Sequence, residues 1–217
     1  MEKPLVVMLG HQAHVGKDTL GEFLIENDSF VRFGFADKLK NTVADLYGFN
    51  DEHMYGSLKN VVDERYGVTP REILQDFGQE QRERFPDIWA DYVFRSIANK
   101  IEHGNKLVDA QLAVPETFKR FVITDFRFPN EHTVALRYAK ELDLNIITIK
   151  IFRPDEERGE FAGSTNISET ALNNFQFDLE LLNSTARGKE DLYNRFRRGV
   201  LETGPAQVIK IDTNTFL

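Results

Sequence analysis

An apolar segment that leads into a glycine-containing loop and a lysine constrains this chain more than any other stretch. Residues 5–9 are all apolar, with the length and composition of a buried parallel strand. The loop after them carries Gly10 and Gly16, and Lys17 stands where a helix should begin. In such a loop the backbone N–H groups and the helix N-terminus attract an anion, and the lysine reaches the outer phosphates of a nucleotide. The stretch therefore predicts a phosphate-binding loop.

This loop is one residue longer than the usual pattern, which has four residues between its glycines and Ser or Thr after the lysine. Here five residues, 11–15, separate Gly10 from Gly16, and Asp18 and Thr19 follow Lys17. An ordinary glycine turn between a strand and a helix is the alternative interpretation. The apolar strand directly before the loop favours phosphate binding, because the motif requires that context.

The composition argues against several other classes of protein. The chain has 217 residues, 41% of them apolar and 29% charged, which is typical of a globular protein and predicts one domain. No apolar run approaches the roughly 20 residues that span a bilayer, and no signal-peptide pattern precedes the first strand. We therefore expect a cytoplasmic protein without a membrane partner, in the host cytoplasm if the chain is of phage origin. The chain has no cysteine, so it forms no disulfides. Its net charge of −8 argues against nonspecific binding of nucleic acid, and an anionic substrate therefore requires a local cluster of basic residues.

Short apolar segments alternate with amphipathic segments, which predicts an α/β fold with a central parallel sheet flanked by helices. We expect strands at residues 5–9, 31–35, 121–124, 145–151, 178–182 and 207–211. We expect helices at residues 17–26, 37–47, 69–85, 86–103, 129–142 and 187–201. The strongest helix start is at Thr69, which caps, with Pro70 in the first turn and Glu72 placed to close a capping box. Residues 49–66 are polar and are predicted to be irregular.

One face of the helix at residues 69–85 carries Arg71, Gln75, Gly78 and Arg82, at positions i, i+4, i+7 and i+11. A solvated polar face is the alternative interpretation of such a stripe. Gly78 weakens that alternative, because glycine inside a helix costs about 1 kcal/mol relative to alanine. A glycine in this position indicates that another group packs closely against the helix, and we expect the flat base of a nucleotide against this face.

Charged residues follow two predicted strands at the edge where ligands collect in an open α/β sheet. Asp37 and Lys40 come just after the strand at residues 31–35, and Asp125 directly follows the strand at residues 121–124. An acidic residue at such a strand end is placed to hold Mg²⁺ or its water shell. Taken alone, Asp125 and the nearby Arg127 are also compatible with an ordinary strand-to-loop turn.

The C-terminal third of the chain contributes two further candidates. Residues 153–168 are polar and carry Arg153, which indicates a lid, with a solvated surface loop as the alternative. Asn183 follows the strand predicted at residues 178–182, at a place suited to contacts with adenine.

Several segments, in order along nearly the whole chain, together resemble the bacteriophage-type deoxynucleoside monophosphate kinases, which are relatives of adenylate and guanylate kinases. These segments are Gly16-Lys17-Asp18-Thr19, Phe35-Ala36 with Leu39-Lys40, Arg71 with Leu74-Gln75 and Gly78, Pro86-Asp87-Ile88-Trp89, Thr124-Asp125-Phe126-Arg127, Arg153-Pro154, Ser168-Glu169, and Asp178 with Asn183. The resemblance implies a P-loop kinase fold in a single domain, residues 1–217. It also implies a helical monophosphate-binding region at residues 37–112 and a short lid at residues 153–168.

The resemblance implies a reaction in which ATP and a deoxynucleoside monophosphate (dNMP) give ADP and the diphosphate (dNDP), with Mg²⁺ as cofactor. Lys17, Asp125 and Arg153 are then the expected catalytic residues. The expected ATP-binding residues are His14, Val15, Gly16, Lys17, Asp18, Thr19 and Asn183, with Asp18 or Thr19 in the magnesium shell. The expected acceptor-binding residues are Asp37, Lys40, Arg71, Gln75, Gly78 and Arg127, of which the two arginines would hold the phosphate.

Two other functions fit the same residues. A P-loop kinase for another small acceptor, such as dephospho-coenzyme A, would use the same phosphate-binding loop. A non-enzymatic nucleotide-binding module would also use it, although such a module has little use for several arginines at an acceptor site. The expected partners are small nucleotides, and the sequence leaves open a homodimer, the accepted bases and the choice between deoxyribose and ribose.

Overall fold

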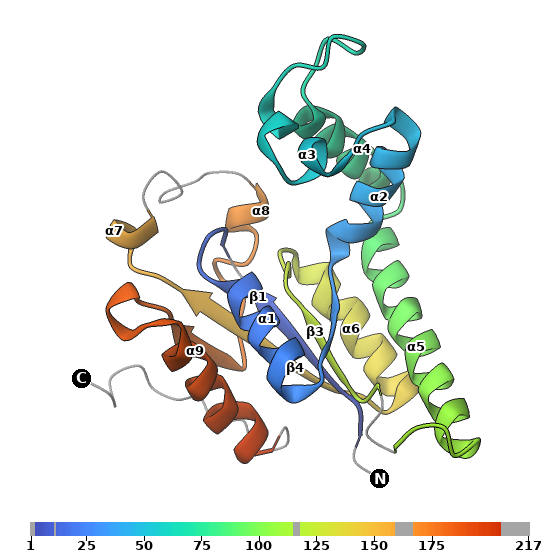
Figure 1. Cartoon of the computed structure of the whole chain (residues 1–217), viewed down its shortest axis with the longest axis vertical. Coiled ribbons are helices and arrows are strands. Elements are labelled where there is room, and N and C mark those ends of the chain that lie inside the picture. Colours follow the sequence, from blue (N-terminus) through green and yellow to red (C-terminus); the bar gives the residue numbers. More distant parts are fainter. Residues whose placement is uncertain (1–2, 11, 115–117, 159–166, 205–217) are drawn as a thin grey trace.

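Five parallel strands form the centre of the structure (Figure 1). The computed structural model describes residues 3–10, 12–114, 118–158 and 167–204. The strands are β1 (Leu5–Gly10), β2 (Val31–Phe33), β3 (Arg120–Ile123), β4 (Asn145–Phe152) and β5 (Leu179–Leu182), in the order β2-β3-β1-β4-β5. All four strand pairs in this sheet are parallel, so the expected α/β fold is confirmed. The strand expected at residues 207–211 lies outside the described residues.

Helices cover both faces of the sheet (Figure 1). They are α1 (Lys17–Asp28), α2 (Phe35–Tyr47), α3 (Asp51–Met54), α4 (Pro70–Arg84), α5 (Ile88–Asp109), α6 (Pro129–Leu142), α7 (Asp155–Arg158), α8 (Ile167–Thr170) and α9 (Lys189–Phe196), with 3₁₀ turns η1 (Ser57–Asn60) and η3 (Thr185–Arg187) and a π-helical segment η4 (Arg197–Glu202). None of the helices described here has the length and apolar character needed to cross a membrane.

The central strand β1 is buried along its whole length. Leu5, Val7 and Leu9 belong to one apolar cluster, together with buried residues of α1 and α9. Val6 and Met8 belong to a second cluster, together with buried residues of α5 and α6. Because both faces of β1 are covered, its sequence is a continuous apolar run rather than an alternating pattern.

The strand order places a topological switch point beside β1. From β1 the chain crosses to β2 at one edge of the sheet and returns through β3, whereas β4 and β5 lie on the other side of β1. In open α/β sheets, ligands bind outside the carboxyl ends of the strands at such a point. The loop between Gly10 and Lys17 follows the carboxyl end of β1, so the fold places it where a ligand is expected.

Several helices differ from their predicted bounds: α5, for example, spans Ile88–Asp109 rather than residues 86–103, and two others differ for identifiable reasons. α2 begins at Phe35 rather than near Asp37, because the carboxylate of Asp125 accepts hydrogen bonds from the backbone N–H groups of Phe35 and Ala36. The helix expected at residues 187–201 is preceded by a separate 3₁₀ turn, because Gly188 has φ +74° and ends that turn.

The elements α2, α3, η1 and α4 extend beyond one end of the sheet (Figure 1). They contain a small apolar cluster of their own, built on Val43, Phe49, Met54, Ile73 and Leu74. The start of α4 is as predicted from the sequence: the Thr69 side chain accepts from the Glu72 N–H, and the Glu72 side chain closes the capping box.

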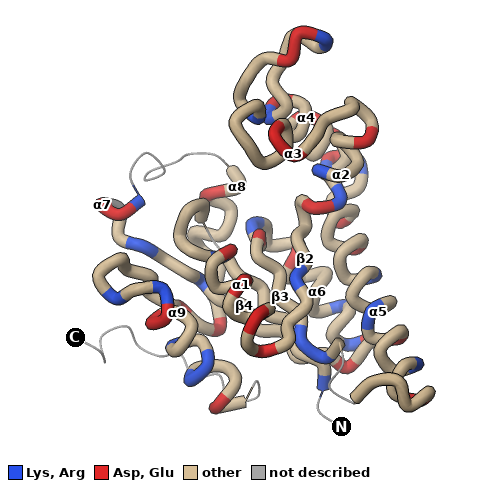
Figure 2. The backbone as a smooth tube through the Cα atoms, in the orientation of Figure 1, with Lys and Arg blue, Asp and Glu red and all other residues tan. Residues whose placement is uncertain are grey.

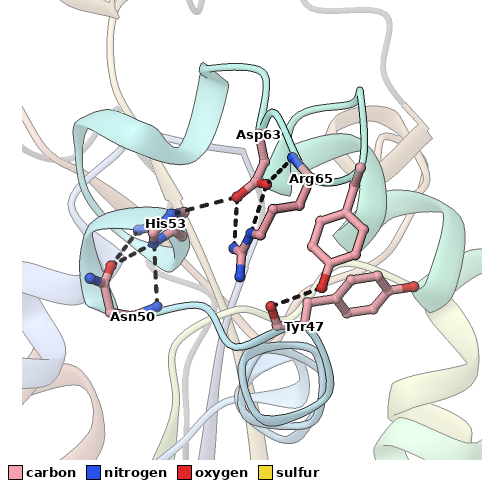
Figure 3. Close-up of polar contacts among 6 residues, drawn as sticks. Tyr47, Asn50, His53, Asp63 and Arg65 are labelled. Carbon is pink, nitrogen blue, oxygen red and sulfur yellow. Dashed lines mark hydrogen bonds and ion pairs between the residues drawn. The ribbon is translucent and has the colours of Figure 1, made fainter.

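The expectation that residues 49–66 are irregular is wrong in part, because residues 51–54 form α3 and residues 57–60 form η1, whereas the rest of the segment consists of turns and irregular structure. Polar side chains in this segment bond to one another (Figure 3). Asn50 and His53 form a reciprocal capping box at the start of α3, and Arg65 donates two hydrogen bonds to Asp63. His53 Nε2 also lies 3.9 Å from Asp63 Oδ2. The polar residues that suggested a loop therefore stabilise short helices.

Candidate active site

The loop between β1 and α1, here called the phosphate loop, needs a glycine at its last position. Gly16 has φ +103°, and a Cβ atom there would also collide with the side-chain amide of Asn183. That amide donates a hydrogen bond to the Val15 carbonyl oxygen, 2.7 Å away. Asn183, expected near adenine, is therefore buried against the phosphate loop, and a contact with adenine stays a prediction.

Lys17 begins α1 and is almost fully buried, with 6% of its surface exposed. Its ammonium group donates to the Gln12 carbonyl oxygen of the same loop. The pKa of Lys17 is lowered from its usual 10.5 to about 8, first by burial and then by the nearby charge of Arg127. Three carboxylates act in the opposite direction, those of Asp18, Glu169 and Asp125. A phosphate beside this ammonium group would stabilise its charged form.

Asp18 and Thr19 lie in the first turn of α1, as expected, with Asp18 exposed and Thr19 half-buried. Both offer an oxygen at the N-terminus of the helix that follows the phosphate loop. His14 is exposed and has φ +58°. Among the described residues, no three His, Asp or Glu side chains form a ready-made metal site. Mg²⁺ commonly binds through one or two protein oxygens together with substrate phosphates, and the oxygens of Asp18 and Thr19 fit that mode.

Asp125 lies two residues beyond the end of β3 and is half-buried. Its Oδ1 accepts from the Phe35 N–H at 2.8 Å, and its Oδ2 accepts from the Ala36 N–H at 2.9 Å. Burial raises the pKa of Asp125, while these two hydrogen bonds act against the shift. The carboxylate thus caps α2 and joins the sheet to the projecting elements. A role at the magnesium shell stays a prediction.

Arg127 is held by two glutamates and a carbonyl group. Its Nη1 donates to the Ser168 carbonyl oxygen at 3.2 Å and forms an ion pair with Glu169 Oε1. The other oxygen of Glu169 accepts from the Ala13 N–H in the phosphate loop, at 2.6 Å. The backbone N–H of Arg127 donates to Glu131 Oε2 at 2.8 Å. Lys17 and Arg127 are thereby brought together, although they follow different strands.

The two glutamates were not among the expected site residues. Glu169 appeared only as part of the Ser168-Glu169 pair in the family resemblance, and Glu131 was predicted only to lie within a helix. Glu131 also accepts from the Phe128 N–H, and burial raises its pKa to about 8. A signal for Glu131 was present, because a glutamate three residues after Phe128, next to Pro129, is typical of a helix N-terminus.

The projecting elements include several basic residues, which are blue along the backbone tube in Figure 2. Lys40 of α2 lies over the ring of Tyr55, with 4.5 Å between Nζ and the ring centroid, and Arg71 is exposed on α4. Lys59 of η1 is half-buried, and its pKa is lowered by burial and then by the charges of Lys40 and Arg71. None of these three cations forms an ion pair with any residue in the described part of the chain. Lys59 had no signal in the sequence, because only the folding of residues 49–66 brings it to the other two.

The expectation of a base against Gly78 is corrected by the packing of α4 on α2. Gly78 is buried, and a Cβ atom at this position would lie 2.8 Å from Leu39 Cδ2. The indole N–H of Trp89 also donates to the Gly78 carbonyl oxygen, at 3.4 Å. The close neighbour of this glycine is therefore the protein itself. Gln75, from the same predicted stripe, is exposed, as is Arg71.

The two remaining candidates have partners within the protein. Asp37 forms an ion pair with Arg32, with 2.8 Å between Oδ2 and Nη1. Arg153 Nε lies 3.9 Å from Glu157 Oε2, at the start of the expected lid. Half of that lid, residues 159–166, lies outside the described residues, whereas its end at Ser168 adjoins the Glu169 contact.

A phosphate loop at the switch point of a parallel sheet, with a lysine, an arginine and carboxylates around it, defines a nucleotide-binding phosphotransferase. A curated protein of Acanthamoeba polyphaga mimivirus, named "Putative deoxynucleotide monophosphate kinase", is 32% identical to this chain over 177 residues. The match covers 78% of this chain and 83% of the viral protein. The chain belongs to the deoxynucleotide monophosphate kinase family and is a kinase. No model of a protein family matches it.

Solved structures show weaker similarity. A protein of Chloroflexus aurantiacus, described as "a putative kinase", has a TM-score of 0.49 and 12% sequence identity, over 94% of this chain and 99% of that one. The dephospho-CoA kinase of Campylobacter jejuni has a TM-score of 0.38 and 18% identity, over 93% and 97% of the two chains. At these TM-scores neither structure bears on the acceptor of this chain.

Proposed function

We propose that this chain transfers the γ-phosphoryl group of ATP to a deoxynucleoside monophosphate, giving ADP and a deoxynucleoside diphosphate. One observation carries the proposal: Glu169 accepts hydrogen bonds from the Ala13 N–H of the phosphate loop and from Arg127, which holds this arginine beside the loop that would bind the donor. The charge of Arg127 also lowers the pKa of the nearby Lys17. A buried lysine and a half-buried arginine that lie close together need anionic partners, and two phosphate groups that react with each other would supply them. The deoxynucleotide acceptor is supported by the name of the viral relative.

Phosphoryl transfer requires positioning and neutralisation of charge rather than a nucleophile from the protein. The N–H groups of the phosphate loop and Lys17 would hold the β- and γ-phosphates of ATP. An oxygen of the acceptor phosphate attacks the γ-phosphorus, the bond from that phosphorus to the β-phosphate oxygen breaks, and ADP leaves with the electron pair. Arg127 would hold the acceptor phosphate in line, and Arg153 would neutralise charge on the transferred group.

The acceptor would extend from Arg127 towards the projecting elements, which belong to the proposed monophosphate-binding region, residues 37–112. Lys40, Lys59 and Arg71 would make that region attractive to an anion. Gln75, exposed on α4, would contact the base or sugar, and Asp37 would lie at the near end of the region. Residues 153–168 would form the lid over the transferred group.

Mg²⁺ would be held by the oxygens of Asp18 or Thr19, next to Lys17. When bound, this ion neutralises charge on the donor phosphates and orients them. Asp125 would act at the edge of its water shell, since both carboxylate oxygens already accept backbone N–H groups.

A coupled assay of ADP release tests the proposal. The purified chain is given MgATP with each of the four dNMPs, with their ribose counterparts and with dephospho-coenzyme A. We expect at least one dNMP to give turnover well above the ATPase background. Turnover with dephospho-coenzyme A and with no dNMP would overturn the proposed acceptor but keep the kinase. ATP binding without turnover of any of these acceptors would also overturn it.

A further inference from the structure

A single carboxylate connects the two parts of the proposed site. Glu169 Oε2 accepts from the Ala13 N–H in the phosphate loop at 2.6 Å, and Oε1 accepts from Arg127 Nη1. The Glu169 side chain is only 11% exposed, and that of Arg127 is 22% exposed. Because Glu169 comes from α8, far along the chain, it joins the loop after β1 to the loop after β3. Ionised hydrogen bonds with little access to water are strong, so this bridge restricts both partners.

The donors of Arg127 show which edge of its guanidinium group remains for a ligand. The group has five N–H donors, two of them on Nη1. The Nη1 donors are occupied by the Ser168 carbonyl oxygen, at 3.2 Å, and by Glu169. Within the described ranges, no residue accepts a hydrogen bond from Nε or Nη2. The Nε–Nη2 edge is the kind of fork that binds two oxygens of one phosphate.

Arg127 also lies close to another positive charge, that of Lys17. The charge of Arg127 acts on the buried ammonium group of Lys17, and the two cations repel each other. The negative charge of Glu169 acts on the same lysine in the opposite direction. The backbone of Arg127 is fixed separately, by the hydrogen bond from its N–H to Glu131 at 2.8 Å. Loss of the Glu169 carboxylate would therefore remove the charged partner of the guanidinium group and leave it the weaker hydrogen bond to the Ser168 carbonyl oxygen, while the backbone stayed in place.

We infer that Glu169 is a positioning residue of the proposed reaction: it fixes the Arg127 guanidinium group against the phosphate loop, so that the Nε–Nη2 edge faces the acceptor phosphate. Glu169 acts through Arg127 and does not itself touch the acceptor. The inference rests on the proposed function, because it assigns Arg127 to the acceptor phosphate.

A double-mutant cycle tests the inference. Glu169→Gln keeps the size of the side chain, but it replaces one of the two oxygens with an NH2 group, which cannot accept from either Ala13 or Arg127. We expect Glu169→Gln to raise the KM for the dNMP about tenfold, with a smaller change in the KM for ATP. In the Arg127→Ala background the same substitution should change the KM for the dNMP by less than about twofold, since its target is gone.

Two further variants complete the test. Glu180→Gln is the matched control, because it removes the partner of Lys150 at an exposed position of β5, outside residues 37–112, and it should leave both KM values unchanged. Glu169→Asp retains the charge with a shorter reach, and it should raise the KM for the dNMP less than Glu169→Gln does. If Glu169→Gln does not fold, the same cycle is run with Glu169→Asp.

The outcomes separate the inference from the proposed function. Equal increases in the KM for the dNMP in the wild-type and Arg127→Ala backgrounds would show that Glu169 does not act through Arg127, and would overturn the inference alone. A lower melting temperature with lower kcat and unchanged KM values would indicate a purely structural role and would also overturn it. A wild-type chain that phosphorylates no dNMP overturns the proposed function, and the inference with it.

Discussion

The Oδ1 atom of Asp125 accepts a hydrogen bond from the backbone N–H of Phe35, 2.8 Å away. Because Oδ2 also accepts from Ala36, the whole carboxylate is used to begin α2, the helix that leads from the sheet into the projecting elements. We predict that Asp125→Asn lowers the free energy of unfolding by about 1–3 kcal/mol, because the amide places an N–H group against a buried donor. Urea unfolding measures this. Unchanged stability with a large loss of kcat would instead indicate that magnesium positioning is the main role of Asp125.

Lys17→Ala is predicted to reduce kcat by at least about 100-fold, because it removes a charge aimed at the transferring phosphates. The melting temperature should hold or rise, since the substitution also removes a buried ammonium group whose pKa is lowered to about 8. The two quantities are measured by the coupled assay and by thermal unfolding. Lys106→Ala, on the surface of α5, is the control. If the Lys17→Ala protein kept half of the wild-type kcat, the assignment of Lys17 to the catalytic site would be wrong.

Lys59→Met and Arg71→Ala are each predicted to raise the KM for the dNMP about tenfold and to leave the KM for ATP nearly unchanged. The reason is that the charges of Lys40 and Arg71 both act on Lys59, so the three cations lie near one another in the region proposed to bind the acceptor. The effect should shrink as salt rises, because partly exposed charges are screened. Lys140→Met, at an exposed position of α6 outside residues 37–112, is the control, and it should leave both KM values unchanged. An increase in the KM for ATP alone would place either residue at the donor site instead.

Gly78→Ala is predicted to change the free energy of unfolding by less than about 1 kcal/mol. Alanine favours the helix by up to about that amount, but its Cβ atom must displace Leu39 Cδ2, which would lie 2.8 Å away. The displaced atom is the end of a flexible side chain, so the shift is small. The KM for the dNMP should stay within about twofold of the wild type. A tenfold increase in the KM for the dNMP with an unchanged melting temperature would show that the base of the acceptor binds against this face of α4.

Stability should depend on the protonation of Glu131. Burial raises its pKa from 4.5 to about 8 in the folded protein, so the folded state holds this proton where the unfolded chain has lost it. The contribution of this group to the free energy of unfolding is therefore present below the unfolded pKa and is lost as the pH rises towards about 8. Glu131→Gln should reduce the fall in stability between pH 5 and about 8. The amide oxygen can still accept from both Arg127 and Phe128, as Oε2 does now.

Urea unfolding of the wild type and Glu131→Gln at several pH values checks this dependence. Glu102→Gln, at an exposed position, serves as the control for loss of a carboxylate. Parallel stability curves for the wild type and Glu131→Gln would contradict a raised pKa at this position.

Features encoded by neighbouring residues were predictable from the sequence. The five apolar residues before Gly10 were sufficient to predict β1. Thr69 and Glu72 were sufficient to predict where α4 begins. In both cases the deciding interactions lie within a few positions along the chain: a continuous apolar run, and a capping box that spans three residues. The family resemblance was likewise readable, because its segments keep their order along the chain.

Only the tertiary structure decided which side chains meet. Glu169 lies 156 positions from Ala13 and 42 from Arg127, and no local pattern encodes such a bridge. The same holds for Gly78, whose neighbour is Leu39 of another helix, and for Lys59, which joins the basic group only when residues 49–66 fold. Local hydrogen bonds and periodicity set the elements, whereas burial and charge pairing between distant loops depend on how the elements pack. The sequence by itself therefore determined the fold class and the phosphate loop, and packing decided the partners of each charged group around it.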